Sequence, residues 1–311
     1  MPENPPTPDS TAPEPIAFSA RDGRELAGLL ARAGPGQSAR GAIVVNGATG
    51  VPREFYLNFA RYCAERGFHA LVYDYRGMGA SANAAPRAES ARMSDWGSKD
   101  MPAAVAWLDR AFPGLPIVTV GHSVGGQLIG LMSNHSRASA HVLIATSVGY
   151  WGYQHAPFRY LALFFWLIYG PLLLRLRGYV PSGGAWPGLP LPPGVFSEWR
   201  EWCLTSQHFA PALDSELREN YFREIRAPLL VYAFEDDPIA TRRAVAALLK
   251  FYPSAAQDVR WISPRTLGLG PIGHQGFFTT RFREALWRPV LDWVEARASA
   301  MAQSTIAPPS S

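Results

Sequence analysis

The chain has 311 residues, of which 48% are apolar and 17% are charged, so it can bury a large core as one domain with an insertion or as two small domains. The net charge of +4 comes from basic residues that are scattered along the chain, which excludes a basic nucleic-acid-binding stripe. The two cysteines, Cys63 and Cys203, form no Cys-x-x-Cys pair, so neither a disulfide framework nor a zinc site is indicated. These features indicate a globular protein with no nucleic-acid partner.

Both ends of the chain are rich in proline and small polar residues. Residues 1–15 have no basic start and no apolar run, which excludes a secretory signal as written. We predict that residues 1–15 and 299–311 are disordered, because such composition cannot bury an apolar core. Without a signal, the expected location is cytoplasmic.

Between these ends, apolar strand-like segments alternate with segments of helical periodicity. The first two strands are expected to form a hairpin, because an Asp-Gly turn separates them. The predicted strands, in chain order, are 16–20, 25–31, 42–46, 69–73, a strand from 117 to the Ser123 turn, 141–147, 228–233 and 259–262. The predicted helices are 54–66, 98–112, one from 126 to 133, 240–251 and 281–299.

This alternation predicts an α/β fold in which a mostly parallel sheet carries helices on both faces. In such sheets ligands bind beyond the carboxyl ends of the strands. The alternation is interrupted over 149–221, which is predicted to be a helical cap inserted into a core made of 16–148 and 222–298.

A candidate nucleophile lies at the end of the strand that begins at Ile117. This strand runs into Gly121-His-Ser123-Val-Gly125 and then into a helical segment. A serine on a sharp strand-to-helix turn projects its hydroxyl above the sheet edge, and the flanking glycines give the turn room. The pattern alone is weak, since a surface turn could also contain it, but the strand and helix around it favour a nucleophile.

A serine nucleophile requires an oxyanion site, which we expect in the loop that follows the strand at 42–46. Asn46-Gly47-Ala48 lies there, and its glycine lets the backbone turn its amides inward. By position, the amides of Ala48 and of Val124, the residue after the nucleophile, are the predicted donors.

The base and its orienting acid are expected at later strand ends. Three carboxylates, Glu235, Asp236 and Asp237, follow the strand at 228–233. We choose Asp237 because a residue before proline is held extended, although Asp236 remains an alternative. His274 lies in a glycine-rich loop before the last long helix, where it can reach over the sheet, and it is the predicted base.

The order Ser123, Asp237, His274 resembles the α/β-hydrolase superfamily. More narrowly, the chain is similar to predicted hydrolases of the serine aminopeptidase and monoglyceride lipase-like group over residues 16–298. The motifs that carry the resemblance are 46–50, Asp74-Tyr-Arg-Gly-Met-Gly-Ala-Ser81, 121–126 and Gly273-His-Gln-Gly-Phe-Phe278. One departure is Phe234, where related chains often have glycine before the acidic turn.

The resemblance implies a two-step acyl transfer that needs no metal or other cofactor. His274 would take the Ser123 proton while Asp237 stabilises the imidazolium, and the substrate would be a small ester or lipid-like molecule. Ester specificity is expected from the cap, whose apolar segment 160–174 falls short of the about 20 residues of a membrane span and is interrupted by Gly170-Pro171. The cap is also expected to touch lipid surfaces. The candidate substrate-binding residues in the cap are Trp151, Trp166, Trp199 and Trp202.

Several alternatives share these features. An aminopeptidase or amidase would need acidic cap residues for a substrate ammonium, and an acyltransferase would differ only in excluding water. A dehalogenase or epoxide hydrolase of this fold would carry aspartate at position 123, so serine argues against both. A non-catalytic protein that binds membrane surfaces through its apolar cap is the alternative of a different class. The sequence does not indicate an oligomeric state.

Overall fold

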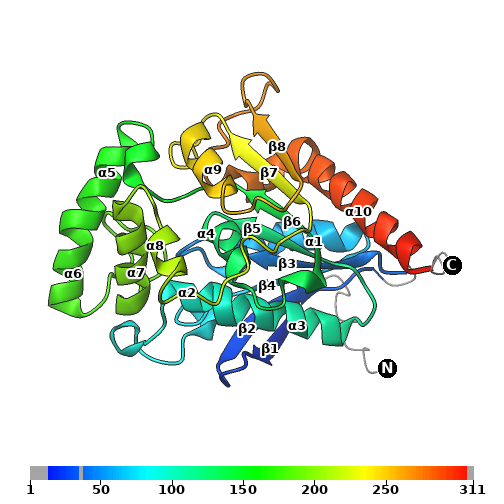
Figure 1. The fold of residues 1–311 in the computed structure, drawn as a ribbon, viewed down its shortest axis with the longest axis horizontal. Coiled ribbons are helices and arrows are strands. Elements are labelled where there is room, and N and C mark those ends of the chain that lie inside the picture. The colour runs from blue at the N-terminus through cyan, green and yellow to red at the C-terminus, as the bar shows by residue number, and fades with distance from the viewer. Residues whose placement is uncertain (1–12, 35–37, 307–311) are drawn as a thin grey trace, which may run out of the picture.

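The computed structural model describes residues 13–34 and 38–306, and within them eight strands form one sheet (Figure 1). The strand order is β1-β2-β4-β3-β5-β6-β7-β8. The first strand pairs antiparallel with the second, as the Asp-Gly turn predicts, and the second pairs antiparallel with the fourth, whereas all later pairs are parallel. The strands are β1 (Glu14–Ser19), β2 (Glu25–Ala31), β3 (Gly41–Asn46), β4 (Phe68–Tyr73), β5 (Ile117–His122), β6 (Ala138–Ile144), β7 (Leu229–Phe234) and β8 (Gln257–Ile262).

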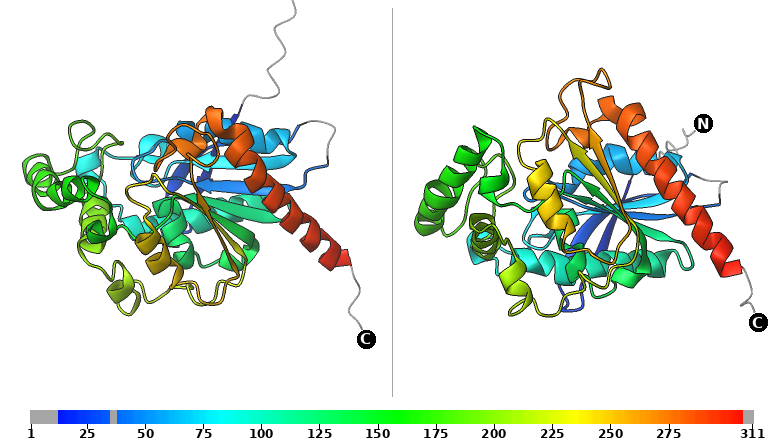
Figure 2. Two further views of the ribbon diagram at one scale, coloured as in Figure 1. Left: turned by 90° about the horizontal axis from the view of Figure 1, so that it is seen from above. Right: turned by 45° about the horizontal axis from the view of Figure 1, so that its top comes forward.

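Helices cover both faces of this sheet (Figure 2). On one face, α1 and α10 bury Phe59 and Val290, and on the other, α3 and α9 bury Val105 and Val245. This confirms the predicted α/β fold with a mostly parallel sheet. The α-helices are α1 (Leu57–Glu65), α2 (Met93–Asp95), α3 (Met101–Ala111), α4 (Val124–Gln127), α5 (Phe158–Phe164), α6 (Gly170–Arg177), α7 (Pro193–Leu204), α8 (Ala210–Leu213), α9 (Arg242–Leu249) and α10 (Arg288–Ile306).

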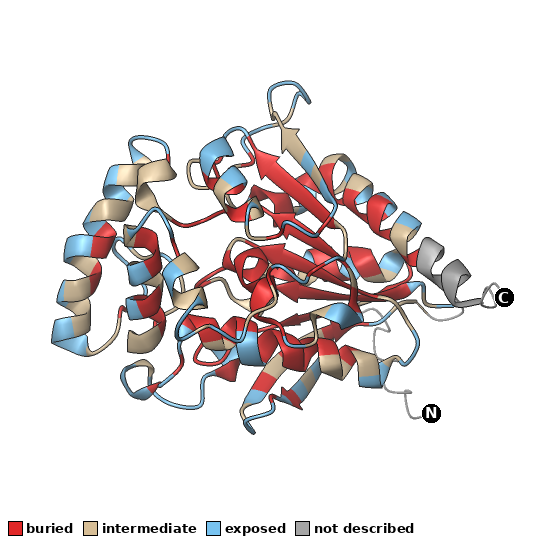
Figure 3. Ribbon diagram, viewed as in Figure 1, coloured by how far each residue is buried: buried red, intermediate tan, exposed pale blue. Residues whose placement is uncertain are grey.

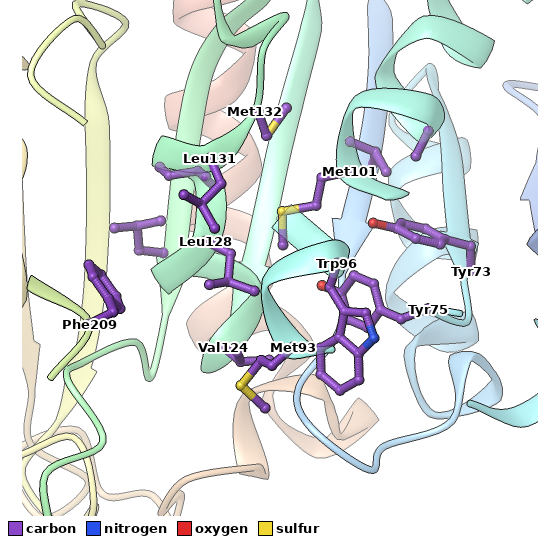
Figure 4. Packing of buried hydrophobic residues seen from close by; sticks show 14 of the residues in the cluster. Tyr73, Tyr75, Met93, Trp96, Met101, Val124, Leu128, Leu131, Met132 and Phe209 are labelled. Carbon is purple, nitrogen blue, oxygen red and sulfur yellow. The ribbon is translucent and has the colours of Figure 1, made fainter. Parts of the chain in front are cut away.

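The central strands β3 and β5 are buried along their whole length, which Figure 3 shows as the red interior. Their near-continuous apolar sequences suit strands covered on both faces. Beside them, Trp96 stacks on Tyr75 at 4.6 Å between ring centroids, and Val124 and Leu128 belong to the same cluster (Figure 4). This packing fixes α4 directly behind the turn that carries Ser123.

The insertion between β6 and β7 carries α5 to α8 at one end of the molecule (Figure 1). Its helix α7 is tied to the core by Glu198, whose carboxylate accepts hydrogen bonds from the Ser94 amide (2.7 Å) and hydroxyl (2.8 Å). Arg92 lies 2.9 Å from the same carboxylate. A buried carboxylate with this many donors anchors the insertion firmly to α2.

Some predicted bounds differ from those in the structure. Strand β6 covers Ala138–Ile144 rather than 141–147, because pairing with β5 recruits the small residues at its start. Strand β1 begins at Glu14, inside the arm predicted to be disordered, and Pro15 is tolerated there because β1 is an edge strand. Helix α10 continues to Ile306, into the predicted tail, since that stretch holds good helix formers. Residues 1–12 and 307–311 lie outside the described part of the chain.

A second difference concerns the apolar segment of the cap. Helix α5, the π-helical turn η8 (Phe165–Tyr169) and α6 follow one another without a break from Phe158 to Arg177. The predicted interruption at Gly170-Pro171 is therefore wrong, because the π-helical turn η8 directly before it accommodates the missing N–H of Pro171 without ending the helix. Within the described residues this one 20-residue helix is long and apolar enough to cross a membrane by length and composition.

Candidate active site

Ser123 occupies the sharp turn between β5 and α4 that the sequence predicts. Its φ of 53° and ψ of −115° lie in a region that non-glycine residues rarely adopt, so the turn is strained. A Cβ on Gly125 would overlap the carbonyl oxygen of Asn46, and one on Gly121 would lie 2.5 Å from the Gly126 backbone. Glycine is therefore required at Gly125 for the turn to pack against β3 and at Gly121 for the strand to pack against the start of α4.

The imidazole of His274 lies between Ser123 and Asp237. Its Nε2 is 3.0 Å from the Ser123 Oγ, and its Nδ1 is 2.8 Å from the Asp237 Oδ2. A carboxylate only accepts hydrogen bonds, so Nδ1 carries the proton and Nε2 is left to accept the serine proton. The structure thus brings together the three side chains that the sequence places in order at separate strand ends.

The two neighbouring aspartates have different partners. The Oδ1 of Asp237 accepts hydrogen bonds from the amides of Ile239 (2.8 Å) and Ala240 (3.1 Å), which orients its Oδ2 toward the imidazole. The Oδ2 of Asp236 instead accepts from the amides of Ile272 (2.8 Å) and Gly273 (3.0 Å). Asp236 therefore holds the loop that carries His274, and Asp237 contacts the imidazole itself.

Asp237 is ionised although it is only 1% exposed. Burial alone would raise the pKa of this carboxyl, but the attraction to the His274 imidazole when that ring is protonated, its hydrogen bond and the two backbone amides outweigh burial and hold the pKa below its usual value. The carboxylate is thus negatively charged beneath the imidazole, where it would stabilise an imidazolium.

A buried hydrogen-bonded chain runs behind the serine. The Ala48 amide donates to the Tyr56 hydroxyl (2.7 Å), which lies 2.9 Å from His122 Nδ1, and His122 Nε2 donates to the His274 carbonyl (2.9 Å). Because Nε2 donates, Nδ1 accepts the tyrosine proton. Burial, aided by the charge of His274, lowers the pKa of His122 to about 3, so its ring is neutral.

In this structure the amide of Ala48, one of the two predicted oxyanion donors, donates its hydrogen bond to the Tyr56 hydroxyl. The sequence offered no signal that Tyr56, eight residues later, would turn its hydroxyl back onto this N–H. The other predicted donor, Val124, is the first residue of α4. Its N–H is one of the helix's first four amides, which have no intrahelical acceptor.

A cavity of about 830 Å³ lies between core and cap, and Ser123, Val124 and His274 line it. Apolar and aromatic side chains make up most of its wall. Among the described residues that line it there is no aspartate or glutamate. A cavity of this kind accommodates an apolar ligand that places a reactive group at the serine.

The four candidate tryptophans divide into two pairs. Trp166 and Trp199 line the cavity and contact each other edge to face, with 4.7 Å between ring centroids. Trp202 packs instead on His208 and Phe209, and Trp151 packs on Tyr150, and neither is among the residues that line the cavity. In this structure both rings contribute to the packing of the cap and its junction with the core.

The cavity also has wall residues beyond the four candidate tryptophans. Trp186 lies in the Gly/Pro-rich segment of the cap and packs on Gly50, next to the loop of Ala48. Gln127 and Gln154 also line the cavity. No periodicity or motif marks these residues, because the cap and core surfaces meet only in the folded chain. Over the described residues, no group of three or more His, Cys, Asp or Glu side chains is placed to hold a metal ion.

Comparison with known proteins agrees with this architecture. Residues 42–262, more than two thirds of the chain, match the alpha/beta hydrolase family, and the chain therefore belongs to that family, as its motifs predict. No curated protein matches the sequence.

Solved structures show the same fold at low sequence identity. A soluble variant of monoglyceride lipase from Saccharomyces cerevisiae, in complex with a substrate analogue, is 14% identical with a TM-score of 0.68, covering 95% of this chain and 99% of its own. The Pyrococcus furiosus esterase Pf2001 is 15% identical with a TM-score of 0.61, covering 95% of each chain. A bacterial membrane phospholipase A is 14% identical with a TM-score of 0.52, covering 93% of this chain and 87% of its own.

Proposed function

We propose that this protein is a serine hydrolase that cleaves carboxylic esters with an apolar acyl or alcohol part. The observation that carries the proposal is the hydrogen-bonded series Ser123, His274, Asp237 on the wall of an apolar cavity. The fold shared with a lipase and an esterase is consistent with it.

In the proposed reaction, His274 Nε2 takes the Ser123 proton as the hydroxyl oxygen attacks the ester carbonyl. The tetrahedral intermediate collapses when the imidazolium gives this proton to the leaving alkoxide, which departs as an alcohol. Water then attacks the acyl-enzyme with the same base, releasing the carboxylic acid and restoring Ser123. Asp237 keeps the imidazole in the required tautomer throughout.

The oxyanion of this intermediate would be held by the amides of Val124 and Ala48. The Ala48 N–H can stabilise the oxyanion only if it gives up its hydrogen bond to the Tyr56 hydroxyl and donates to the oxyanion instead. A hydrogen bond to an anion is roughly twice as strong as one between neutral groups, which favours that exchange as charge develops.

Ester hydrolysis is favoured over aminopeptidase activity by the charge of the cavity. A substrate ammonium needs a carboxylate, and in the described part of the chain none lines the wall. The buried cap carboxylate, Glu198, is already held by Ser94 and Arg92. Acyl transfer to an alcohol instead of water would use the same residues.

A serine-directed fluorophosphonate probe tests the nucleophile. Wild type should be labelled stoichiometrically and should hydrolyse a panel of medium-chain esters faster than the matched aminoacyl amides. Ser123→Ala should lose labelling and turnover, whereas Ser197→Ala, at an exposed position on α7 outside the cavity, should keep both. Labelling that persists in Ser123→Ala would refute the assignment.

We also propose that the cap helix from Phe158 to Arg177 contacts lipid surfaces. This helix has basic residues near both ends and no acidic residue, which suits an anionic bilayer. Two of its exposed side chains, Leu161 and Phe164, also line the cavity, so an apolar substrate could pass from lipid to Ser123. Its seven large apolar side chains that are 44–69% exposed are Tyr160, Leu161, Phe164, Leu167, Ile168, Leu172 and Leu176.

Flotation with phosphatidylcholine vesicles, with and without phosphatidylglycerol, tests this contact. Wild type should bind, and more strongly to the anionic vesicles. Replacing Ile168 and Leu172 together by serine should weaken binding, while Leu267→Ser, an equally exposed leucine in a distant loop, should not. Equal binding by all three proteins, or none by wild type, would contradict the proposal.

A further inference from the structure

A second cavity, of about 550 Å³, adjoins the candidate active site, because Gln154 lines both cavities. Three arginines line it, from two segments that are far apart in the sequence. Arg159 is the second residue of α5 in the cap, whereas Arg242 and Arg243 are the first two residues of α9 in the core. Like charges that share one wall repel each other, so this arrangement costs free energy unless anions balance it.

The two carboxylates that line this second cavity leave part of the positive charge unbalanced. Both oxygens of Asp237 already accept hydrogen bonds, from the imidazole beside it and from two backbone amides. Glu235 lies 3.1 Å from Arg242 and balances that one arginine. Arg159 and Arg243 form no salt bridge with any residue that the structure describes. Two guanidinium groups in this wall therefore lack a counter-charge.

Contacts within the protein hold these guanidinium groups in position. The Arg243 guanidinium lies over the Tyr153 ring, 4.2 Å from its centroid. That of Arg242 lies over the Trp261 ring, 4.4 Å from its centroid. Arg159 donates through Nε and one Nη to two backbone carbonyls, at 3.0 and 3.2 Å. Stacking covers the face of a guanidinium and leaves the N–H groups on its edge for a ligand, and such preorganised side chains lose less conformational freedom on binding.

A phosphate monoester fits these charges better than a carboxylate does. It carries a charge of about −1.5 to −2 and three acceptor oxygens, so it can bind two guanidinium groups at once. A carboxylate carries one charge and is satisfied by a single guanidinium fork. The start of α9 adds to the positive potential, since anions are stabilised near helix N-termini. The chemistry of the wall therefore favours a phosphate group.

We propose that Arg159 and Arg243 bind the phosphate group of a phosphate monoester in this second cavity, with Arg242 as a further donor. The site lies beside the chemistry at Ser123 and does not depend on ester hydrolysis. The phosphate can belong to a small soluble molecule or to a lipid headgroup such as that of phosphatidic acid. Because Arg159 is part of the cap helix 158–177, a bilayer that contacts this helix would bring headgroups close to it.

Isothermal titration calorimetry on the full-length protein tests the site with glycerol 3-phosphate and with glycerate, a carboxylate of similar size. Wild type should bind glycerol 3-phosphate more tightly than glycerate by about 10-fold or more, because only the phosphate can bind both guanidinium groups. Arg159→Gln and Arg243→Gln should each weaken the binding of glycerol 3-phosphate by about 10-fold or more, since each removes charge-assisted hydrogen bonds. The double variant should show no measurable binding.

Two further variants control for charge and for folding. The double variant Arg110→Gln/Arg288→Gln removes two exposed arginines on α3 and α10, outside both cavities, and should keep the wild-type affinity. Glu235→Gln should instead tighten binding by about 2- to 5-fold, because it releases Arg242 from its carboxylate. A folding defect does not produce tighter binding, so this opposite effect identifies charge as the cause.

Flotation with phosphatidylcholine vesicles, with and without phosphatidic acid, distinguishes the two sources of phosphate. For a lipid headgroup, the Arg159/Arg243 double variant should lose most of the additional binding that phosphatidic acid confers, and the Arg110/Arg288 control should keep it. Equal additional binding by the two double variants assigns the site to a soluble phosphate monoester, which the titration detects.

Three results would overturn the proposal. The first is that wild type binds neither glycerol 3-phosphate nor phosphatidic acid. The second is that the two double variants bind both probes equally well, and the third is that glycerate binds as tightly as glycerol 3-phosphate. Each of these results leaves ester hydrolysis at Ser123 untouched, because the measurement is of binding at a separate cavity.

Discussion

At the scale of single residues, the two aspartates after β7 allow a direct comparison. Asp237→Asn should lower kcat by about 10⁴-fold, because an asparagine that faces the imidazole favours the wrong tautomer. Asp236→Asn should stay within about 10-fold of wild type, because its amide oxygen can still accept from Ile272 and Gly273. Both values come from steady-state hydrolysis of one ester.

The thermal midpoint of each variant is the control, because both side chains also bind backbone amides. A larger loss of kcat in Asp236→Asn than in Asp237→Asn, with both proteins folded, would reverse the roles of the two carboxylates.

The residues of the candidate site differ in how far the sequence could predict them. Ser123, the acidic turn with Asp237 and the loop of His274 each follow a strand, and strand ends meet at one edge of a parallel sheet, so chain order was sufficient to group these three segments but not to separate Asp237 from Asp236. The bond between the Tyr56 hydroxyl and the Ala48 amide depends on a side-chain rotamer, and no pattern encodes it. The same holds for Trp186, whose neighbour in the fold, Gly50, is far away in sequence.

At the scale of elements, the turn between β5 and α4 depends on close backbone packing. Gly125→Ala should unfold the turn or abolish turnover, because its Cβ would overlap the Asn46 carbonyl oxygen at the end of β3. The Asn46 backbone cannot move aside as a flexible side chain can. We therefore expect the free energy of unfolding to fall by about 3 kcal/mol or more, because overpacking typically costs about 1–3 kcal/mol and this contact is with backbone. Urea denaturation and the rate of ester hydrolysis measure the two effects.

Gly34→Ala is the matched control, since a Cβ there would meet nothing within 4 Å and its φ is not positive. This control should match wild type in both assays. A Gly125→Ala protein as stable and as active as the control would show that the turn can relax away from β3.

Elements were predicted best where the local pattern and the fold agree. The β5 strand and the helix behind it follow from a buried apolar run and a glycine-rich turn. The cap helix was misjudged because Gly170-Pro171 signals a break, whereas the π-helical turn before it keeps the chain helical. Strand β6 begins earlier than predicted because pairing with β5 outweighs the weak strand preference of its first residues.

At the scale of the whole molecule, core and cap share one cavity. The sequence shows the apolar composition of the cap, but the cavity wall depends on how α5 to α7 rest on the core. The Leu189 amide, which donates to the Gly50 carbonyl at 2.8 Å, and the Glu198 contact with α2 hold the two parts together. The shape of the cavity therefore depends on how the cap packs against the core, which a local sequence pattern does not encode.

Acid lability is a property of the whole molecule that follows from three buried histidines, His122, His141 and His208. Burial, joined at His122 and His141 by the charge of another histidine, lowers the pKa of each to about 3 from about 6.5. The unfolded chain therefore binds up to three more protons than the folded one between these values. The free energy of unfolding should keep its full value above pH 6.5 and fall as the pH drops below it. Because each additional proton contributes about 1.4 kcal/mol per pH unit, three protons give a slope of up to about 4 kcal/mol per pH unit.

Urea denaturation at several pH values between 7 and 4 measures this slope. His208→Asn should reduce it by about one third, because one of three protons no longer binds, and asparagine tolerates the φ of 53° at that position. A typical stability of about 5–15 kcal/mol would be lost within a few units below pH 6.5, whereas a free energy of unfolding that stays flat down to pH 4 would contradict neutral, buried imidazoles.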